Sequence, residues 1–165
     1  QLKYSHGKFS PHAFEVLANS INSINDGFHN QKWPEKIFIR RNSKVRKVVN
    51  EQQIEIFLKN NGYQVVEPES LTFMEQVYLF RNVKSVVASA GAALANIVFA
   101  PHKAQIVILI ATHPDTSYWY WQNIACASGK QISYVLGAII EGQDNGLHSD
   151  FEIKLDDLNA AINYS

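Results

Sequence analysis

The chain lacks the features that mark disulfide-rich, membrane-spanning or nucleic-acid-binding proteins. Its single cysteine, Cys126, excludes an internal disulfide and favours a reducing compartment, so we expect a cytoplasmic protein. Fifteen basic residues balance fifteen acidic ones, which leaves no net charge to attract nucleic acid or an anionic membrane. No apolar run approaches the roughly 20 residues that span a bilayer, so no transmembrane segment is expected.

Three common nucleotide-site fingerprints are also missing. No G-x-G-x-x-G follows a predicted strand, which argues against a dinucleotide-dependent oxidoreductase. No G-x-x-x-x-G-K-[ST] is present, which argues against a P-loop NTPase. The first predicted strand ends in Arg40 and Arg41, the reverse of the acidic pair of a receiver-like signalling domain. The histidines show no metal-ligand spacing, and no metal site is expected.

The composition is that of one globular domain spanning residues 1–165. Apolar residues make up 46% of the chain and charged residues 18%, which is enough to bury a core. No repeat or internal linker interrupts it. The chain opens at Gln1 with no methionine and no leader, so we expect it to be part of a longer protein.

Strands and helices are predicted to alternate along the chain. Apolar runs predict strands at 36–40, 63–66, 85–88, 105–110 and 131–139. Helical periodicity and end signals predict helices from 11 to 24, 50 to 61, 72 to 80, 92 to 99, 116 to 128 and 155 to 162. Asn50 with Gln53 and Thr72 with Glu75 resemble capping boxes. This order predicts an α/β fold, a Rossmann-like open, mostly parallel sheet with helices on both faces.

A basic run follows the first predicted strand. Residues 40–47 contain five lysines and arginines and no acidic residue. Such a run is either a solvated loop or a phosphate site, because arginine forks match phosphate oxygens with two bonds each.

The stretch "SVVASAGAALANIVF", residues 85–99, places small residues between a strand and a helix. Ser89 and the backbone N–H groups of Gly91 and Ala92 are candidate phosphate ligands at the start of that helix. Close packing of helix on sheet is the alternative. Because ligands of parallel sheets collect beyond the carboxyl ends of strands, the two strand ends together predict a nucleotide diphosphate.

Other polar and aromatic residues have two interpretations each. Gln76 either reaches a base or sugar edge or is an exposed helix position. His148 and Asp150 are either a general base pair or part of a solvated loop. The aromatic residues at 119–121 form either core and rim packing or an interdomain contact.

Several ordered motifs resemble the family 61 glycosyltransferases, capsular polysaccharide biosynthesis type, in their carboxyl-terminal part. The likeness extends from about residue 36 to 109, with a weaker likeness out to residues 148–151. The matching motifs are Arg40-Arg41, Arg46, Asn50-Glu51, GYQVVEPESL (62–71), EQVYLF (75–80) and GAALANIVF (91–99).

The resemblance implies the carboxyl-terminal half of a GT-B enzyme, which binds a nucleotide sugar, commonly a UDP-sugar, for metal-independent transfer. A preceding domain is then expected to supply much of the site for a glycan acceptor and often the catalytic base, which we do not assign. The residues expected at the nucleotide sugar are Arg40, Arg41, Arg46, Gln76, Ser89, Gly91, Ala92 and Asn96.

Two positions depart from the family pattern. The family histidine before the G-A pair falls at Ala90, and the family glutamate of the next strand falls at Ile108. A second interpretation is therefore a degenerate relative that binds a nucleotide sugar, or only a partner protein, without transfer.

Overall fold

A six-stranded sheet with the order β2-β1-β3-β4-β5-β6 forms the centre of the computed structural model. The structure describes residues 8–22, 31–43, 45–140, 142 and 146–164. Strands β1 to β5 are parallel, and β6 is antiparallel to β5. The strands are β1 Lys36–Ile39, β2 Gln64–Val66, β3 Ser85–Ser89, β4 Gln105–Ala111, β5 Ile132–Ile139 and β6 Phe151–Glu152.

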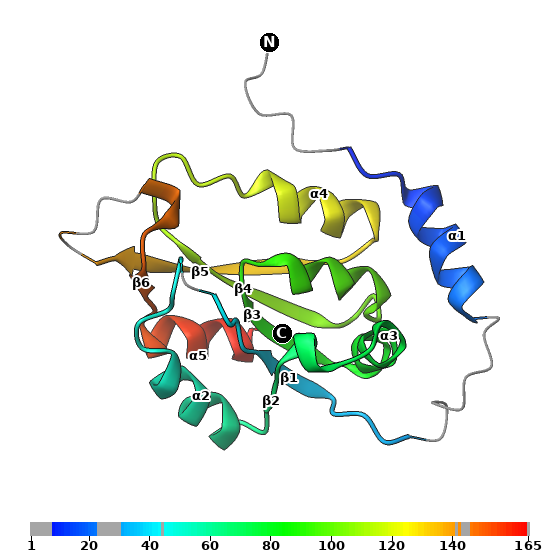
Figure 1. Ribbon diagram of the computed structural model, residues 1–165, viewed down its shortest axis with the longest axis horizontal. Coiled ribbons are helices and arrows are strands. Elements are labelled where there is room, and N and C mark those ends of the chain that lie inside the picture. The colour runs from blue at the N-terminus through cyan, green and yellow to red at the C-terminus, as the bar shows by residue number, and fades with distance from the viewer. Residues whose placement is uncertain (1–7, 23–30, 44, 141, 143–145, 165) are drawn as a thin grey trace, which may run out of the picture.

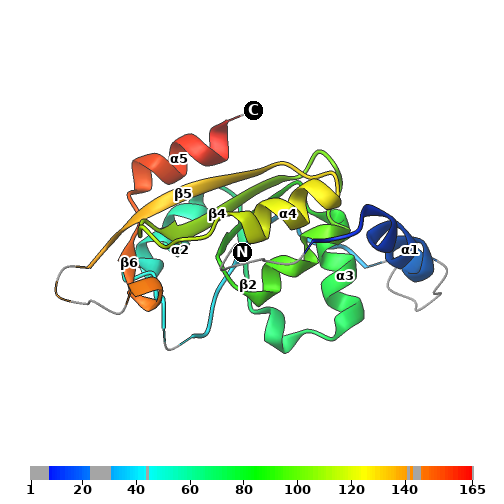
Figure 2. The same ribbon diagram turned by 90° about the horizontal axis from the view of Figure 1, so that it is seen from above.

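Helices cover both faces of this sheet (Figures 1 and 2). Helices α2 and α5 lie on one face, and α3, α4 and the 3-10 helix η3 lie on the other. Their bounds are α1 Pro11–Asn22, α2 Glu51–Asn60, α3 Phe73–Asn82, η3 Ala92–Phe99, α4 Trp119–Ala127 and α5 Leu155–Asn163. Two short 3-10 turns are η2 Pro68–Ser70 and η4 Gly146–His148. In the part of the chain described, no helix is long and apolar enough to cross a membrane.

Two apolar cores lie on opposite sides of the sheet. In β3, Val86 and Ala88 face the core under α3, η3 and α4, whereas Val87 faces the core under α2 and α5. This alternation within a fully buried strand is the reason β3 reads as a continuous apolar run. The predicted α/β fold, a mostly parallel Rossmann-like sheet with helices on both faces, is confirmed.

Several local sequence signals act as predicted. Thr72 and Glu75 form a reciprocal capping box at the start of α3. The Ala13 N–H donates to the Ser10 hydroxyl at 3.3 Å, which caps α1. Gly62 and Gly129 follow α2 and α4 with φ angles of +83° and +68°, a region that glycine enters without steric cost. Residues 23 and 24 of the first predicted helix lie outside the described residues.

Other expectations are corrected. Asn50 forms no capping box, because its amide bonds the backbone of Ile153 instead, 103 residues away. The segment 92–99 is a 3-10 helix, and α4 begins at Trp119 rather than at residue 116. Strand β6 was not predicted, since two residues carry no periodicity.

The strand order creates a switch point between β1 and β3. The chain moves from β1 to β2 on one side and then crosses to β3 on the other side of β1. The connections therefore diverge at the carboxyl ends of β1 and β3, which is where ligands of such sheets bind. The two segments that follow these strands are the basic run and the small-residue stretch.

Gly137 of β5 leaves room for β6. A Cβ atom at this position would overlap the Phe151 ring and lie 2.8 Å from the Glu152 carbonyl oxygen. We predict that Gly137→Ala lowers the free energy of unfolding by about 1–3 kcal/mol through overpacking, as measured by urea denaturation. Gly91→Ala is the matched control, because its Cβ would meet Arg41 at an ordinary 3.4 Å. An equal loss of stability in Gly137→Ala and Gly91→Ala would contradict overpacking at Gly137.

Candidate functional site

Arg41 links the carboxyl ends of β1 and β3. Its guanidinium Nη1 donates to the Ala90 carbonyl at 2.8 Å, just beyond β3. Its backbone N–H lowers the pKa of the Glu51 carboxyl, which belongs to the first residue of α2. Arg41 therefore joins three elements at the switch point while its side chain stays half-buried.

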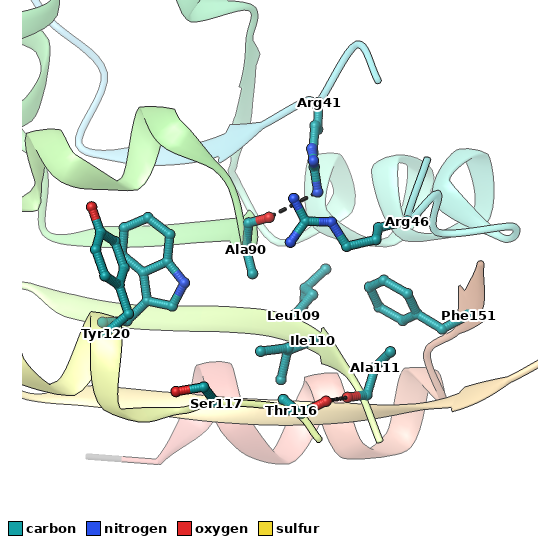
Figure 3. A pocket seen from close by; sticks show the side chains of 11 residues that line it. Arg41, Arg46, Ala90, Leu109, Ile110, Ala111, Thr116, Ser117, Tyr120 and Phe151 are labelled. Atoms are coloured by element: carbon teal, nitrogen blue, oxygen red, sulfur yellow. Dashed lines mark hydrogen bonds between the residues drawn. The ribbon is translucent and has the colours of Figure 1, made fainter. Parts of the chain in front are cut away.

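Arg46 occupies a left-handed backbone conformation, with φ +55°. Its N–H donates to the His148 carbonyl at 3.2 Å, so this turn is held by a distant part of the chain. Its Nε is buried and has no hydrogen-bond partner among the described residues. In Figure 3, the guanidinium ends of Arg41 and Arg46 converge beside the Ala90 carbonyl. A buried donor without a partner is costly.

Two cavities share this pair of arginines. The first, of about 380 Å³, runs from the guanidinium groups past Thr116 and Ser117 to Tyr120 and is drawn in Figure 3. The second, of about 340 Å³, lies on the side of the basic run. Its lining residues are Arg41, Asn42, Ser43, Arg46, Lys47, Val48, Glu51 and Ser89. The arginine pair thus stands where two cavities meet.

Among the described residues, the arginine pair is not held by an ion pair, because no carboxylate there forms a salt bridge with Arg41 or Arg46. Burial lowers the pKa of Arg41, and the nearby charge of Arg46 lowers it further. Arginine remains protonated despite such shifts, so the two like charges attract an anion to this point.

Arg40 lies apart from this pair. Its guanidinium forms ion pairs with Glu55 and, at 3.0 Å, with Glu67. The hydrogen bonds to Glu55 and then to Glu67 raise the pKa of Arg40. Adjacent arginines of the same run thus have different partners, and Arg40 lines neither cavity.

The small-residue stretch is brought to the pair only in part. Ser89 is buried and lines the second cavity. Gly91 lies against the Arg41 side chain but has φ −170°, an extended conformation open to any residue. Ala92 is exposed and lines neither cavity. The predicted roles of these residues stay predictions.

Gln76 and Asn96 bond to each other away from the arginines. The Asn96 Nδ2 donates to the Gln76 Oε1 at 2.8 Å. The Gln76 amide in turn donates to the carbonyls of Pro68 and Leu71. These bonds tie η3 to α3 and to the turn before it, and neither residue lines the two cavities.

The wall of the first cavity that lies opposite the arginine pair was not predicted from the sequence. This wall is formed by Thr116 and Ser117 of the loop between β4 and α4, by Tyr120 and Trp121 of α4, and by Phe151 of β6. Residues 116–121 follow a parallel strand, and this position could have predicted that they lie at the site. Phe151 lay within the weaker family likeness, but its place in the wall depends on pairing with residues 47–49. No group of three or more potential metal-binding side chains gathers among the residues described.

The two departures from the family pattern lie in different surroundings. Ala90 lines the first cavity, and its carbonyl accepts the Arg41 bond. Ile108 is fully buried in the core on the α3 and α4 side. The change at position 90 therefore alters the cavity wall, whereas Ile108 lines neither of the two cavities.

The left-handed backbone at Arg46 gives a test of strain. We predict that Arg46→Gly is more stable than Arg46→Ala by about 1 kcal/mol, because glycine adopts a positive φ without steric cost. Urea denaturation of the two variants measures the difference. The same pair at exposed Val45 is the control, where alanine should be the more stable residue. The same order at both positions would contradict strain at Arg46.

The family comparison agrees with this arrangement. The model of the glycosyltransferase 61 family matches residues 3–107, more than half of the chain. The matched part includes Arg41, Arg46, Glu51 and Ser89, and it ends before α4 and β6. No curated protein matches the chain. With its parallel sheet and the arginine pair at the switch point, this chain belongs to the glycosyltransferase 61 family.

Proposed function

We propose that the chain binds a nucleotide-diphosphate sugar, a UDP-sugar, and that Arg41 and Arg46 hold the diphosphate. One observation carries the proposal: two guanidinium groups converge, neither forms an ion pair with a described carboxylate, and the buried Nε of Arg46 has no partner among those residues. A diphosphate supplies a counter-charge and several acceptor oxygens at once. Arginine forks suit these oxygens, and the bonds are charge-assisted.

The shape of the first cavity supports a nucleotide. It continues from the guanidinium groups to hydroxyls of Thr116 and Ser117 and to the Tyr120 ring. Its volume of about 380 Å³ lies in the range of small-molecule sites. A ligand anchored by its phosphates at Arg41 and Arg46 extends along this wall, where an aromatic ring and hydroxyls offer stacking and hydrogen bonds.

The reaction we propose is glycosyl transfer to a glycan acceptor in capsular polysaccharide biosynthesis, in the cytoplasm. The two arginines stabilise the negative charge that develops on the departing diphosphate, in the place of a metal ion. The motif resemblance supports a GT-B arrangement in which a preceding domain brings the acceptor and the base. This chain then supplies the donor half of the cleft.

Ala90 favours a second function, donor binding without transfer. It lines the first cavity at the position where the family pattern has histidine. A methyl group can neither donate nor accept a proton. Release of UDP from UDP-sugars by the intact parent protein, in the presence of glycan acceptors, separates the two functions, because a binding protein releases none above the rate without enzyme.

The diphosphate assignment predicts a difference between neighbouring arginines. Arg46→Gln should weaken UDP binding about tenfold or more, because charge-assisted hydrogen bonds contribute roughly 1.5–3 kcal/mol. Isothermal titration calorimetry at low ionic strength measures the affinity. Arg40→Gln removes the same charge from a guanidinium that pairs with Glu55 and Glu67, and we expect less than a twofold effect.

An equal loss for both variants would assign the effect to net charge, and an unchanged affinity for Arg46→Gln would overturn the assignment. A larger loss for Arg40→Gln would restore Arg40 as the phosphate ligand.

The proposed charge stabilisation also predicts the effect of divalent cations. UDP affinity should be the same within twofold in excess EDTA and in millimolar Mg²⁺ or Mn²⁺, because the guanidinium groups neutralise the phosphates. The same calorimetric titration measures both conditions. If UDP bound tenfold more tightly with either cation, charge stabilisation by arginine alone would be wrong and a metal-assisted site would be indicated.

A further inference from the structure

Glu51 is the carboxylate of the candidate site. It opens α2 and lines the second cavity together with Arg41, Arg46 and Ser89. Among the residues that line the two cavities, it is the single aspartate or glutamate. An acidic side chain next to the proposed diphosphate position repels the phosphates, so its presence needs another explanation.

The contacts of Glu51 leave acceptor capacity open to the cavity. The Arg41 backbone N–H faces its carboxylate closely enough to lower the pKa of Glu51. Arg40, whose charge lowers the pKa of Glu51, is engaged by Glu55 and Glu67. Within the described residues, Glu51 forms no salt bridge. A carboxylate has about four acceptor positions, so a contact with the Arg41 N–H leaves others available.

An ionised carboxylate accepts hydrogen bonds and donates none, so its ligand must bring donors. The part of a nucleotide sugar that offers uncharged donors is a vicinal pair of hydroxyl groups. We infer that Glu51 is a specificity-determining residue that accepts hydrogen bonds from such a diol, on the ribose or on the sugar, while Arg41 and Arg46 hold the diphosphate. This inference rests on the proposed function.

The surroundings of Glu51 favour strong hydrogen bonds. Burial raises the pKa of Glu51, whereas the charge of Arg40 and the Arg41 N–H lower it. The Glu51 carboxylate is therefore partly desolvated and lies near a positive charge. Hydrogen bonds to such a charged acceptor are stronger than those between neutral groups.

The experiment compares the wild-type chain with Glu51→Gln by calorimetry. Glutamine keeps the size and one acceptor for the Arg41 N–H but loses the charge. The probes are pyrophosphate, UDP, 2′,3′-dideoxy-UDP and UDP-glucose. Pyrophosphate has no hydroxyl groups, and we expect Glu51→Gln to bind it equally or more tightly, since a negative charge beside the anion is gone.

The other probes distinguish the two sources of the diol. If the ribose is the source, Glu51→Gln binds UDP about tenfold more weakly and binds 2′,3′-dideoxy-UDP as the wild type does. If the sugar is the source, UDP binds equally to both proteins and UDP-glucose binds about tenfold more weakly to the variant. Either result supports the inference.

Glu55→Gln is the matched control, since Glu55 lies one turn further along α2 and lines neither cavity. It should leave the ratio between UDP and pyrophosphate affinities unchanged. An equal loss for all probes in Glu51→Gln, or no loss for any, would overturn the role of Glu51 while leaving diphosphate binding intact. If wild-type chain binds neither pyrophosphate nor UDP, the proposed function fails and this inference fails with it.

Discussion

The hydrogen bonds between residues 46–50 and residues 148–153 hold the binding edge of the molecule together. The backbone N–H of Lys47 donates to the Asp150 carboxylate at 2.7 Å, and the backbones of Lys47 and Val49 bond that of Phe151 at 2.9 Å. The Asn50 amide completes the ladder at Ile153. These bonds fix the basic run against the sheet edge and close the cavity wall with Phe151. Without them, Arg46 would sit on an unsupported loop and its guanidinium would return to water, where screened charges attract an anion weakly.

The elements of the fold were predictable where their signals are local. The Thr72 capping box, the glycines after α2 and α4 and the apolar runs of β1 to β5 all depend on a few neighbouring residues. The predictions of local structure that failed share a cause. The sequence around Asn50 resembles a helix cap, but the Asn50 amide bonds the backbone of Ile153, far along the chain. Strand β6 forms because residues 47–49 and β5 pair with it. The periodicity of apolar residues along the sequence carries no information about such long-range contacts.

The candidate site was predictable to a similar depth. Parallel strands bring their carboxyl ends to one edge, so the residues after β1 and β3 had to be neighbours. Which arginine faces the cavity depends on ion pairs that composition does not reveal: Arg40 turns to Glu55 and Glu67, whereas Arg41 turns to Ala90. Gln76 and Asn96 bond each other and line neither cavity. The family match ends in β4, so the wall from α4 and β6 lies outside it. Relatives can therefore share the arginine pair and differ in the wall that faces the rest of the ligand.

The left-handed turn at Arg46 has a consequence for evolution. Every arginine codon of the CGN box becomes a glycine codon by one base change, and glycine suits this backbone better than arginine does. A lineage that no longer uses the ligand meets no folding barrier to that mutation, and the mutation relieves local strain. Selection for folding alone thus drives position 46 away from arginine. Under the proposed function, ligand binding retains an arginine at this turn, and glycine at the same position in a relative would mark a protein that has kept the fold and abandoned the site.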